Sequence, residues 1–205
     1  MAKIKYTKNE LKAQKDALRR FERFLPMLQL KKQQLQAEIQ NISAAIAGKD
    51  AETQEVRAAL GRWVEMLSEP AGLETLVTIE AIDRGEGNIA GVVIPVLNDV
   101  RMKLKDYDLY QTPTWLDDAV EALQQLIRLR IARETLEEQR RRIAEELRLT
   151  SQRVNLFEKV KIPECRENIR VIRIFLGDEQ TAAVARGKIA KKRVLNWERD
   201  EGHAA

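Results

Sequence analysis

An unbroken heptad repeat fills the N-terminal third of the chain and constrains the fold more than any other feature. One row of the repeat runs from Ile4 to Leu67 and the other from Thr7 to Trp63, and most members of both rows are apolar. Rows spaced three and four residues apart form one stripe along an α-helix, which predicts a coiled-coil partner. About 64 residues at a rise of ~1.5 Å each give a helix of roughly 95 Å. That length exceeds what a compact domain needs.

A second apolar stripe in the C-terminal half supplies a partner for the first helix. Its members are Val120, Leu123, Ile127, Leu129, Leu136, Ile143, Leu147, Val154, Phe157, Ile162, Cys165, Ile169, Ile172 and Leu176. Its heptad frame shifts within residues 157–162, which predicts a stutter rather than a break. Two helices joined by a compact segment fold back antiparallel, with Leu67 facing about Leu116. We therefore expect an all-α dominated fold, in which residues 5–67 and 114–176 form a long antiparallel two-helix coiled coil.

Turn-forming and cap-forming residues divide the chain. Glu69–Pro70–Ala71–Gly72 ends the first helix, and Pro113–Thr114, with an acidic residue three positions on, begins the second. Gly177–Asp178 predicts a C-cap followed by an N-cap. The antiparallel pairing also brings Trp63 close to Trp115. The expected segments are the N-terminal coiled-coil helix 1–68, a small head 69–113, the C-terminal coiled-coil helix 114–177, and a basic helix with a tail, 178–205.

The segment between the helices has a β-forming pattern. Residues 76–79 and 89–94 are rich in Val and Ile and flank the glycine-containing run 83–88, which indicates a hairpin. The residues assigned to its turn are Gly85, Gly87 and Asn88. Apolar and basic residues alternate over 100–105, which suggests a third short extended piece. We expect a small, acidic head that contains a β-hairpin.

Basic residues concentrate at both ends of the chain. Residues 1–32 hold ten lysines and arginines against three acidic residues, and residues 186–193 hold five and no acid. Because Ile4 should face about Glu179, residues 180–197 have no N-terminal partner and should project as a single basic helix. Its cations are Arg186, Lys188, Lys191, Lys192 and Arg193. From the residues alone, three uses stay open: a solvated face, nucleic-acid binding by phosphate neutralisation, or docking on an acidic protein surface.

The residue types that carry most enzymatic chemistry are scarce. A single cysteine, Cys165, and a single histidine, His203, exclude a disulfide framework and a multi-Cys metal site. Gly85-x-Gly87 lacks the third glycine of a dinucleotide-binding loop and the Lys-Ser/Thr of a P-loop. The acids of 137–146 alternate with arginines as i,i+3 and i,i+4 pairs of an exposed helix. Neither a signal peptide nor a transmembrane helix is predicted, so we expect a cytosolic protein without catalytic residues, cofactor or metal.

One stretch, Arg153 to Pro163, resembles the Arg-Val-Asn-x-Leu/Phe-Glu…Ile-Pro signature of the D subunit of V-type and archaeal-type ATPases and ATP synthases. The matching residues are Arg153, Val154, Asn155, Glu158, Ile162 and Pro163. Asn168–Ile169–Arg170, the basic run 188–192 and the stretch 88–92 continue the resemblance. It covers essentially the whole chain in order and is closer to a bacterial branch of the family.

The resemblance implies a central-stalk rotor shaft, which couples ATP hydrolysis or synthesis mechanically to rotation of an ion-translocating membrane rotor. The implied partners are the catalytic and non-catalytic ring subunits, the small F subunit of the central stalk and the socket subunit of the membrane rotor. The five cations near the C-terminus would contact the ring. The implied location is the cytoplasmic face of the plasma membrane, reached through the complex, without membrane insertion, nucleic acid or cofactor. The rival interpretation is a self-associating coiled-coil scaffold or a basic coiled coil that binds nucleic acid.

Overall fold

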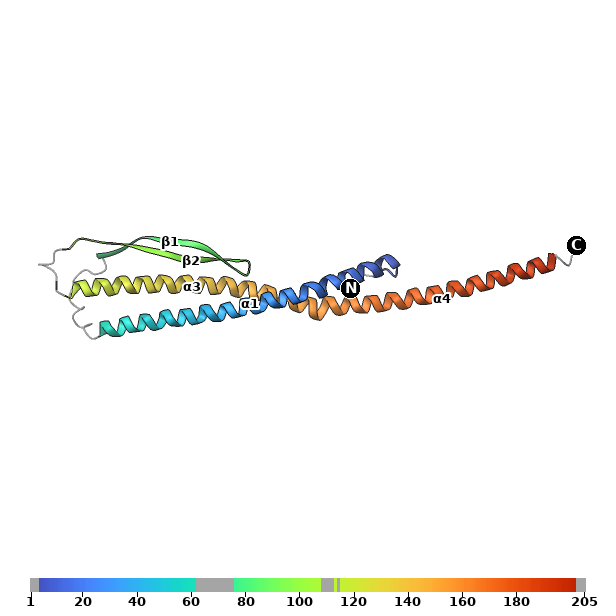
Figure 1. The fold of residues 1–205 in the computed structure, drawn as a ribbon, viewed down its shortest axis with the longest axis horizontal. Helices are drawn as coiled ribbons and strands as arrows, with labels where there is room; N and C mark the ends of the chain where they lie inside the picture. The colour runs from blue at the N-terminus through green and yellow to red at the C-terminus, as the bar shows by residue number, and fades with distance from the viewer. Residues whose placement is uncertain (1–3, 62–75, 108–112, 114, 202–205) are drawn as a thin grey trace. The chain divides into compact units, whose positions relative to one another are not determined.

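The computed structural model describes residues 4–61, 76–107, 113 and 115–201, and for 197–201 it describes only the backbone. In chain order, the elements are α1 (Lys8–Gly61), β1 (Val77–Ile89), β2 (Val92–Leu104), α3 (Leu116–Leu156), the π-helical turn η2 (Phe157–Lys161) and α4 (Ile162–Glu201). Figure 1 labels all of them except η2. They form two compact units, which we call the terminal unit (residues 1–29 and 152–205) and the hairpin unit (residues 30–151). The expectations for Trp63, Thr114 and His203 fall on positions outside the described residues.

The predicted heptad frame is present along the whole of α1. Each a and d position from Leu11 to Leu60 is buried or half-buried. The buried ones are Leu35, Ile42 and Ile46. Pro26 lies inside the helix at an exposed position without ending it. A proline there removes one backbone donor and strains the preceding turn. Packing along the seam, rather than local helix propensity, therefore keeps this part of α1 helical.

Within the hairpin unit, α1 and α3 run antiparallel. Lys31 Nζ lies 2.7 Å from Glu146 Oε1, and Arg133 Nε lies 2.7 Å from Asp50 Oδ1. Residue numbers thus fall along α3 as they rise along α1. The three buried residues of α1 pack with Ile143 in one core cluster, so the charged pairs flank an apolar seam. This arrangement confirms the predicted antiparallel pair.

Within the terminal unit, α1 and α4 are also antiparallel. The ring of Tyr6 stacks on that of Phe175 with centroids 5.0 Å apart, and Arg166 Nη2 lies 2.9 Å from Glu22 Oε1. The predicted stripe supplies the α4 side of the seam. Its buried members here are Ile162, Cys165, Ile169 and Ile172.

The turn η2 lies where the predicted shift of the heptad frame occurs. The backbone N–H of Ile162 donates to the carbonyl of Phe157, five residues earlier. A π-turn contains one more residue than an α-turn, so Phe157 and Ile162 both stay on the face that meets α1. The rings of Phe157 and Phe21 lie 5.0 Å apart between centroids. Pro163 follows at once; a proline clashes with the carbonyl four residues before it, which the wider turn relieves. The predicted stutter within a continuous helix is confirmed.

The predicted helix end at Gly177–Asp178 is wrong. α4 continues from Ile162 to Glu201, and Gly177 does not have the positive φ that a C-cap glycine adopts. Glycine inside a helix costs only about 1 kcal/mol relative to alanine, which a helix of 40 residues tolerates. Thr181 Oγ1 donates to the carbonyl of Gly177 at 3.1 Å. The boundary expected between 114–177 and 178–205 therefore falls inside one helix.

Two antiparallel strands of 13 residues each form the hairpin, which is longer than predicted. Val77 pairs with Leu104 at one end and Ile89 with Val92 at the other. The turn is therefore Ala90–Gly91, and both residues have positive φ, 51° and 83°. Two-residue turns with positive φ at both positions match the twist of the flanking strands. The third extended piece expected from the sequence is the second half of β2.

Gly85, Gly87 and Asn88 lie within β1, so the predicted position of the turn is wrong. A Cβ on Gly87 would lie 2.9 Å from Cγ2 of Val96, so this glycine allows a close cross-strand contact rather than a turn. Asn88 supports the turn from the strand, because its Oδ1 accepts a hydrogen bond from the Gly91 N–H at 2.9 Å. The glycine-rich run was a misleading turn signal, because glycine also serves where backbone and side chains approach closely.

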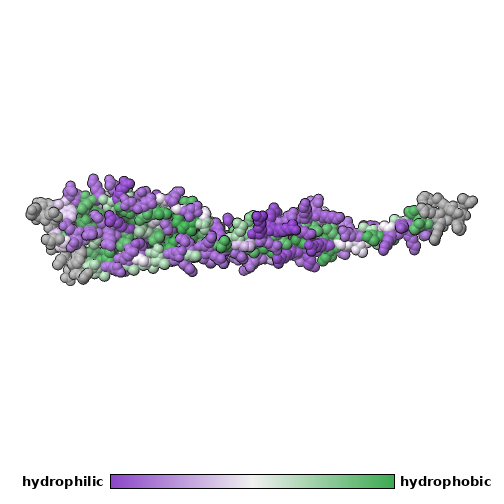
Figure 2. All heavy atoms as spheres, in the orientation of Figure 1, coloured by the Kyte–Doolittle hydropathy of each residue, from purple (hydrophilic) through white to green (hydrophobic). Residues whose placement is uncertain are grey.

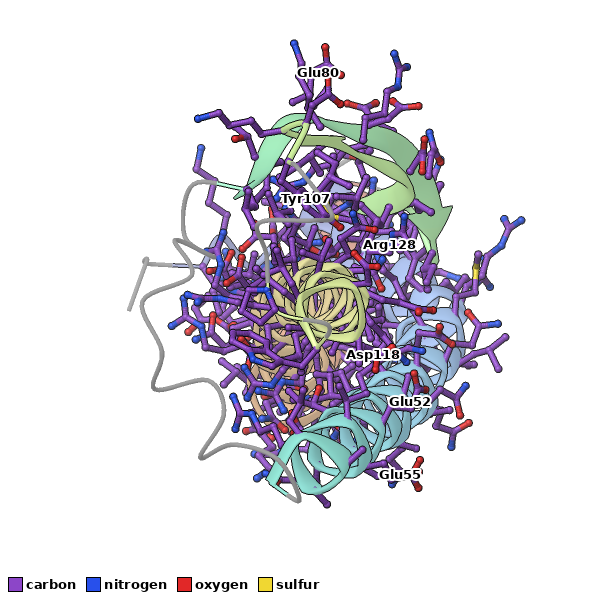
Figure 3. The ribbon with its side chains drawn as sticks, turned by 90° about the vertical axis from the view of Figure 1, so that its left-hand side faces the viewer. Glu52, Glu55, Glu80, Tyr107, Asp118 and Arg128 are labelled. Carbon is purple, nitrogen blue, oxygen red and sulfur yellow. The ribbon has the colours of Figure 1, made fainter. Side chains whose placement is uncertain are left out.

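The hairpin lies along α3 rather than forming a separate head, as Figure 1 shows. Ile94, beside the turn, is buried in the core cluster shared by α1 and α3. At the other end of the hairpin, Leu76 packs against Leu116. Figure 3 shows Glu80 on the face of the hairpin that points away from the helices. The described part of the expected head 69–113 thus belongs to one compact unit with the helices beside it.

Candidate functional site

The five cations expected to contact a partner lie on an exposed part of α4, residues 177–196, which we call the basic helix end. All side chains of this segment are exposed. Among the described residues, no acid forms an ion pair with any of the five cations. At about 100° per residue, Arg186 and Arg193 share one face of the helix while the three lysines lie opposite. Positive charge therefore surrounds the helix, which suits a partner that encloses it.

The same segment carries apolar side chains that nothing in the described structure covers. They are Val184, Ile189, Val194 and Leu195, each at least half exposed. They do not form one continuous stripe, because they too are spread around the helix. The basic helix end therefore presents no seam for a further coiled-coil partner.

The six residues of the resemblance surround η2. Two of them, Val154 and Ile162, are buried. The four exposed ones are Arg153, Asn155, Glu158 and Pro163. They are thus not gathered around a pocket, and their visible contribution is to the packing and phase of the helix.

Two side chains of α3 hold β2 in place, and the sequence analysis predicted neither contact. Gln139 Nε2 donates to the carbonyl of Pro95 at 2.6 Å, and Arg142 Nη1 donates to that of Val93 at 3.3 Å. Both lie in a charged stretch that resembles a solvated helix face. Their i,i+3 spacing places them on one side of α3 and is the only sequence signal for this role.

The expected ladder of ion pairs on α3 is present. Glu138 Oε1 lies 2.7 Å from Arg141 Nη2 and 2.8 Å from Arg142 Nε. Arg141 Nη1 also lies 2.9 Å from Glu145 Oε1. Hydrogen bonds from Arg141 and then Arg142 lower the pKa of Glu138 from 4.5 to about 2. This carboxylate is therefore a fixed negative charge at neutral pH and not a proton donor.

Cys165, the single thiol, is buried in the seam of the terminal unit, as predicted. Burial raises the pKa of the thiol, which keeps it protonated and unreactive at neutral pH. Within the described ranges, no group of three or more His, Cys, Asp or Glu side chains is placed to hold a metal ion. No described helix is both long and apolar enough to cross a membrane.

A groove of about 790 Å³ in the hairpin unit lies between α1 and α3. Leu123, Leu126 and Ile127 give it an apolar floor, and the pair of Asp50 and Arg133 lies at its rim. The hydrogen bond that Arg133 donates to Asp50 raises the pKa of Arg133, so this guanidinium stays charged. None of the described residues that line this groove is Ser, Cys or His, so these residues provide packing and charge but no nucleophile–base pair.

Comparison with known proteins identifies the family. The model of a family described as the D subunit of ATP synthase matches residues 10–192. The V-type ATP synthase D subunit of Borreliella burgdorferi is 44% identical over 200 residues, which cover 98% of this chain and 99% of that protein. That of Chlamydia muridarum is 36% identical over 196 residues, 94% of this chain and 97% of that protein.

The chain belongs to the ATP synthase D-subunit family.

The match to the D-subunit family includes most of both compact units and all of η2. It ends at residue 192, within the basic helix end, and so includes four of its five cations. The resemblance found in the sequence is confirmed, and the relatives are bacterial, as expected. The family match does not assign a role to individual residues.

Proposed function

We propose that the chain is the central-stalk shaft of a V-type ATP synthase and couples the chemistry of a catalytic ring to rotation of an ion-translocating membrane rotor. Membership of the D-subunit family over nearly the whole chain carries this proposal. The paired helices and the exposed basic helix end support it. A shaft needs a packed body, and it needs an unpaired segment that can contact the catalytic ring.

The helix pair suits the transmission of torque. α1 packs along an apolar seam in each unit, with buried Leu35, Ile42 and Ile46 in the hairpin unit and the ring contact Phe21–Phe157 in the terminal unit. A closely packed apolar interior resists sliding of one helix along the other. A twist applied at one level of the pair is therefore passed along it rather than absorbed by unpaired chain.

The basic helix end would meet acidic or polar residues of the ring. Exposed ion pairs contribute only about 0.2–1 kcal/mol each and are screened by salt. A rotating contact needs this weakness, because a strong pair would hold the shaft in one orientation. Five cations distributed around the helix, Arg186 to Arg193, can exchange partners as it turns.

The other partners follow from the same proposal. The hairpin unit would contact the small F subunit and the socket subunit of the membrane rotor, while ATP would be handled by the ring subunits and not by this chain. Its place would be at the cytoplasmic face of the membrane, held there through the complex. Nucleic acid has no part in this function.

The test is ATP-driven rotation of the reconstituted complex. Replacing Arg186, Lys188, Lys191, Lys192 and Arg193 by Gln should reduce assembly or coupling, and more strongly at high salt, without lowering the helicity of the isolated chain. The control replaces three exposed arginines of α3, at 128, 140 and 148, by Gln. A chain truncated after Gly177 that still assembles and rotates normally would show that the basic helix end is only a solvated terminus.

The rival function, a self-associating scaffold, has its own measurement. Light scattering after size-exclusion chromatography should find the isolated chain as a monomer, and as a one-to-one complex with the small F subunit when the two are mixed. A stable homodimer that the F subunit does not dissociate would contradict the shaft and support the scaffold.

A further inference from the structure

A second basic surface lies in the terminal unit, away from the basic helix end. It is a groove of about 480 Å³ between α1 and α4, and we call it the basic groove. Leu18 and Ile169 form its apolar part. Its charged lining consists of Lys15, Arg19, Glu22, Arg166 and Arg173. Figure 2 shows hydrophilic side chains crowded over the visible face of this helix pair, with apolar atoms between them.

The charges of the basic groove are poorly balanced. Glu22 is its single acid and already pairs with Arg166, at 2.9 Å. Lys15, Arg19 and Arg173 form no ion pair with any side chain that the structure describes. Cations on both helices thus line one groove, and their mutual repulsion favours any ligand that brings negative charge between them.

The basic wall on α1 is longer than the groove itself. Lys8, Lys12, Lys15 and Arg19 follow one another at steps of four, three and four residues, so they share one face of the helix. All four also line an adjoining hollow, together with Leu11 and a single acid, Asp16. The row extends about 17 Å along the helix axis at ~1.5 Å per residue, which is the length of a short acidic helix or extended strand.

We propose that the basic groove binds an acidic segment of a partner protein, which sets an apolar side chain over Leu18 and Ile169. The apolar floor favours a protein over a nucleic acid, because a phosphate backbone gains nothing from it. None of the lining residues is aromatic, so nucleotide bases have no stacking platform. A second copy of the terminal unit is disfavoured as the occupant, because it would bring the same positive charge to the contact.

The inference does not depend on the proposed function. It concerns a different surface, and it can be tested on the full-length isolated chain. Failure of the proposed rotor role would leave the basic groove and its charge imbalance unchanged. Failure of peptide binding would leave assembly through the basic helix end untouched.

The probe is a synthetic peptide rich in Glu and Leu, compared with the same peptide carrying Gln in place of Glu. Binding is followed by fluorescence anisotropy, and its position by hydrogen exchange of backbone amides over residues 8–22 and 166–173. The acidic peptide should bind and protect both ranges, and the Gln peptide should not. Replacing Arg19 and Arg173 together by Gln should weaken binding by roughly tenfold, because two exposed charge pairs are lost. The matched control, Arg128→Gln with Arg140→Gln at exposed positions of the hairpin unit, should leave binding unchanged.

A charge swap keeps the test decisive if the glutamine variant folds poorly. The variant Lys15→Glu with Arg19→Glu should lose the acidic peptide and bind a Lys-Leu version of it. The proposal is overturned if the acidic peptide gives no protection over the two ranges. It is also overturned if a single-stranded DNA oligonucleotide of equal charge binds more tightly, which would assign the basic groove to nucleic acid.

Discussion

At the scale of single residues, Gly87 decides how closely the two strands of the hairpin approach. We expect Gly87→Ala to destabilise the chain by about 1–2 kcal/mol, because its Cβ would lie 2.9 Å from the Val96 side chain and force a shift. Gly48→Ala is the matched control. No atom lies within 4 Å of a Cβ at this exposed helical position, so the change should stabilise by about 0.5–1 kcal/mol. Urea denaturation monitored by circular dichroism measures both, and two changes of the same sign would contradict this account.

The ionisation of the Glu138 carboxylate makes the stability of α3 depend on pH under acidic conditions. Its pKa is about 2 in the folded chain against 4.5 unperturbed, so its contribution is fully present above pH 4.5 and is lost as the pH falls toward 2. We expect Glu138→Gln to lower the melting temperature slightly at pH 7 and to leave it unchanged at pH 2. The side chain is partly exposed, so the effect should also shrink in high salt. Glu121→Gln, at an exposed position without a described ion pair, is the control.

At the scale of elements, Pro26 is a local weakness that the helix pair tolerates. Pro26→Ala restores a backbone donor and removes a steric clash at an exposed position of α1, so it should stabilise the chain by about 1–3 kcal/mol. Gln33→Ala, at another exposed position of the same helix, should change stability by less than about 0.5 kcal/mol. If Pro26→Ala destabilised the chain in urea, the proline would be part of the packing rather than a fault in it.

The helices could be predicted from the sequence because their signal is repeated many times. Each a and d residue from Leu11 to Leu60 indicates the same frame, and even the extra residue of η2 is visible as a phase shift. The turn of the hairpin and the end of α4 each depended on a few glycines. Glycine is ambiguous, since it serves equally at a turn, at a close contact such as Gly87, or inside a long helix such as Gly177.

The two basic surfaces also differ in how far the sequence could predict them. The basic helix end was visible as a run of charge in one stretch of sequence. The basic groove was not, because it depends on which residues of α4, such as Arg166 and Arg173, face the row that begins at Lys8. The anchors Gln139 and Arg142 were missed for a related reason: their partners are backbone carbonyls, which any residue could supply.

At the scale of the whole molecule, the basic helix end should be dispensable for folding. A chain truncated after Gly177 should lose helical ellipticity in proportion to its missing residues while its melting temperature stays nearly the same, because the described side chains that it removes, those of residues 178–196, are all exposed. The contrasting variant is Ile172→Ala, five residues earlier, which should destabilise by about 2–4 kcal/mol because Ile172 is fully buried. A large drop in melting temperature on truncation would show that the segment helps to hold the fold.

The way in which α3 holds the hairpin also bears on solubility. An open strand edge is a template on which a second chain can add, and from such pairing fibrous aggregates grow. Gln139 and Arg142 donate hydrogen bonds to two carbonyls of β2, so these carbonyls cannot accept from a strand of a second chain. β1 carries Glu80, Asp83 and Glu86, all exposed, so two copies meeting there would bring like charges together. The irregular register between Ile79 and Ala81 also bends β1, which makes its edge a poorer template for strand pairing. Both edges of this two-stranded sheet are therefore poor templates for pairing with a second chain.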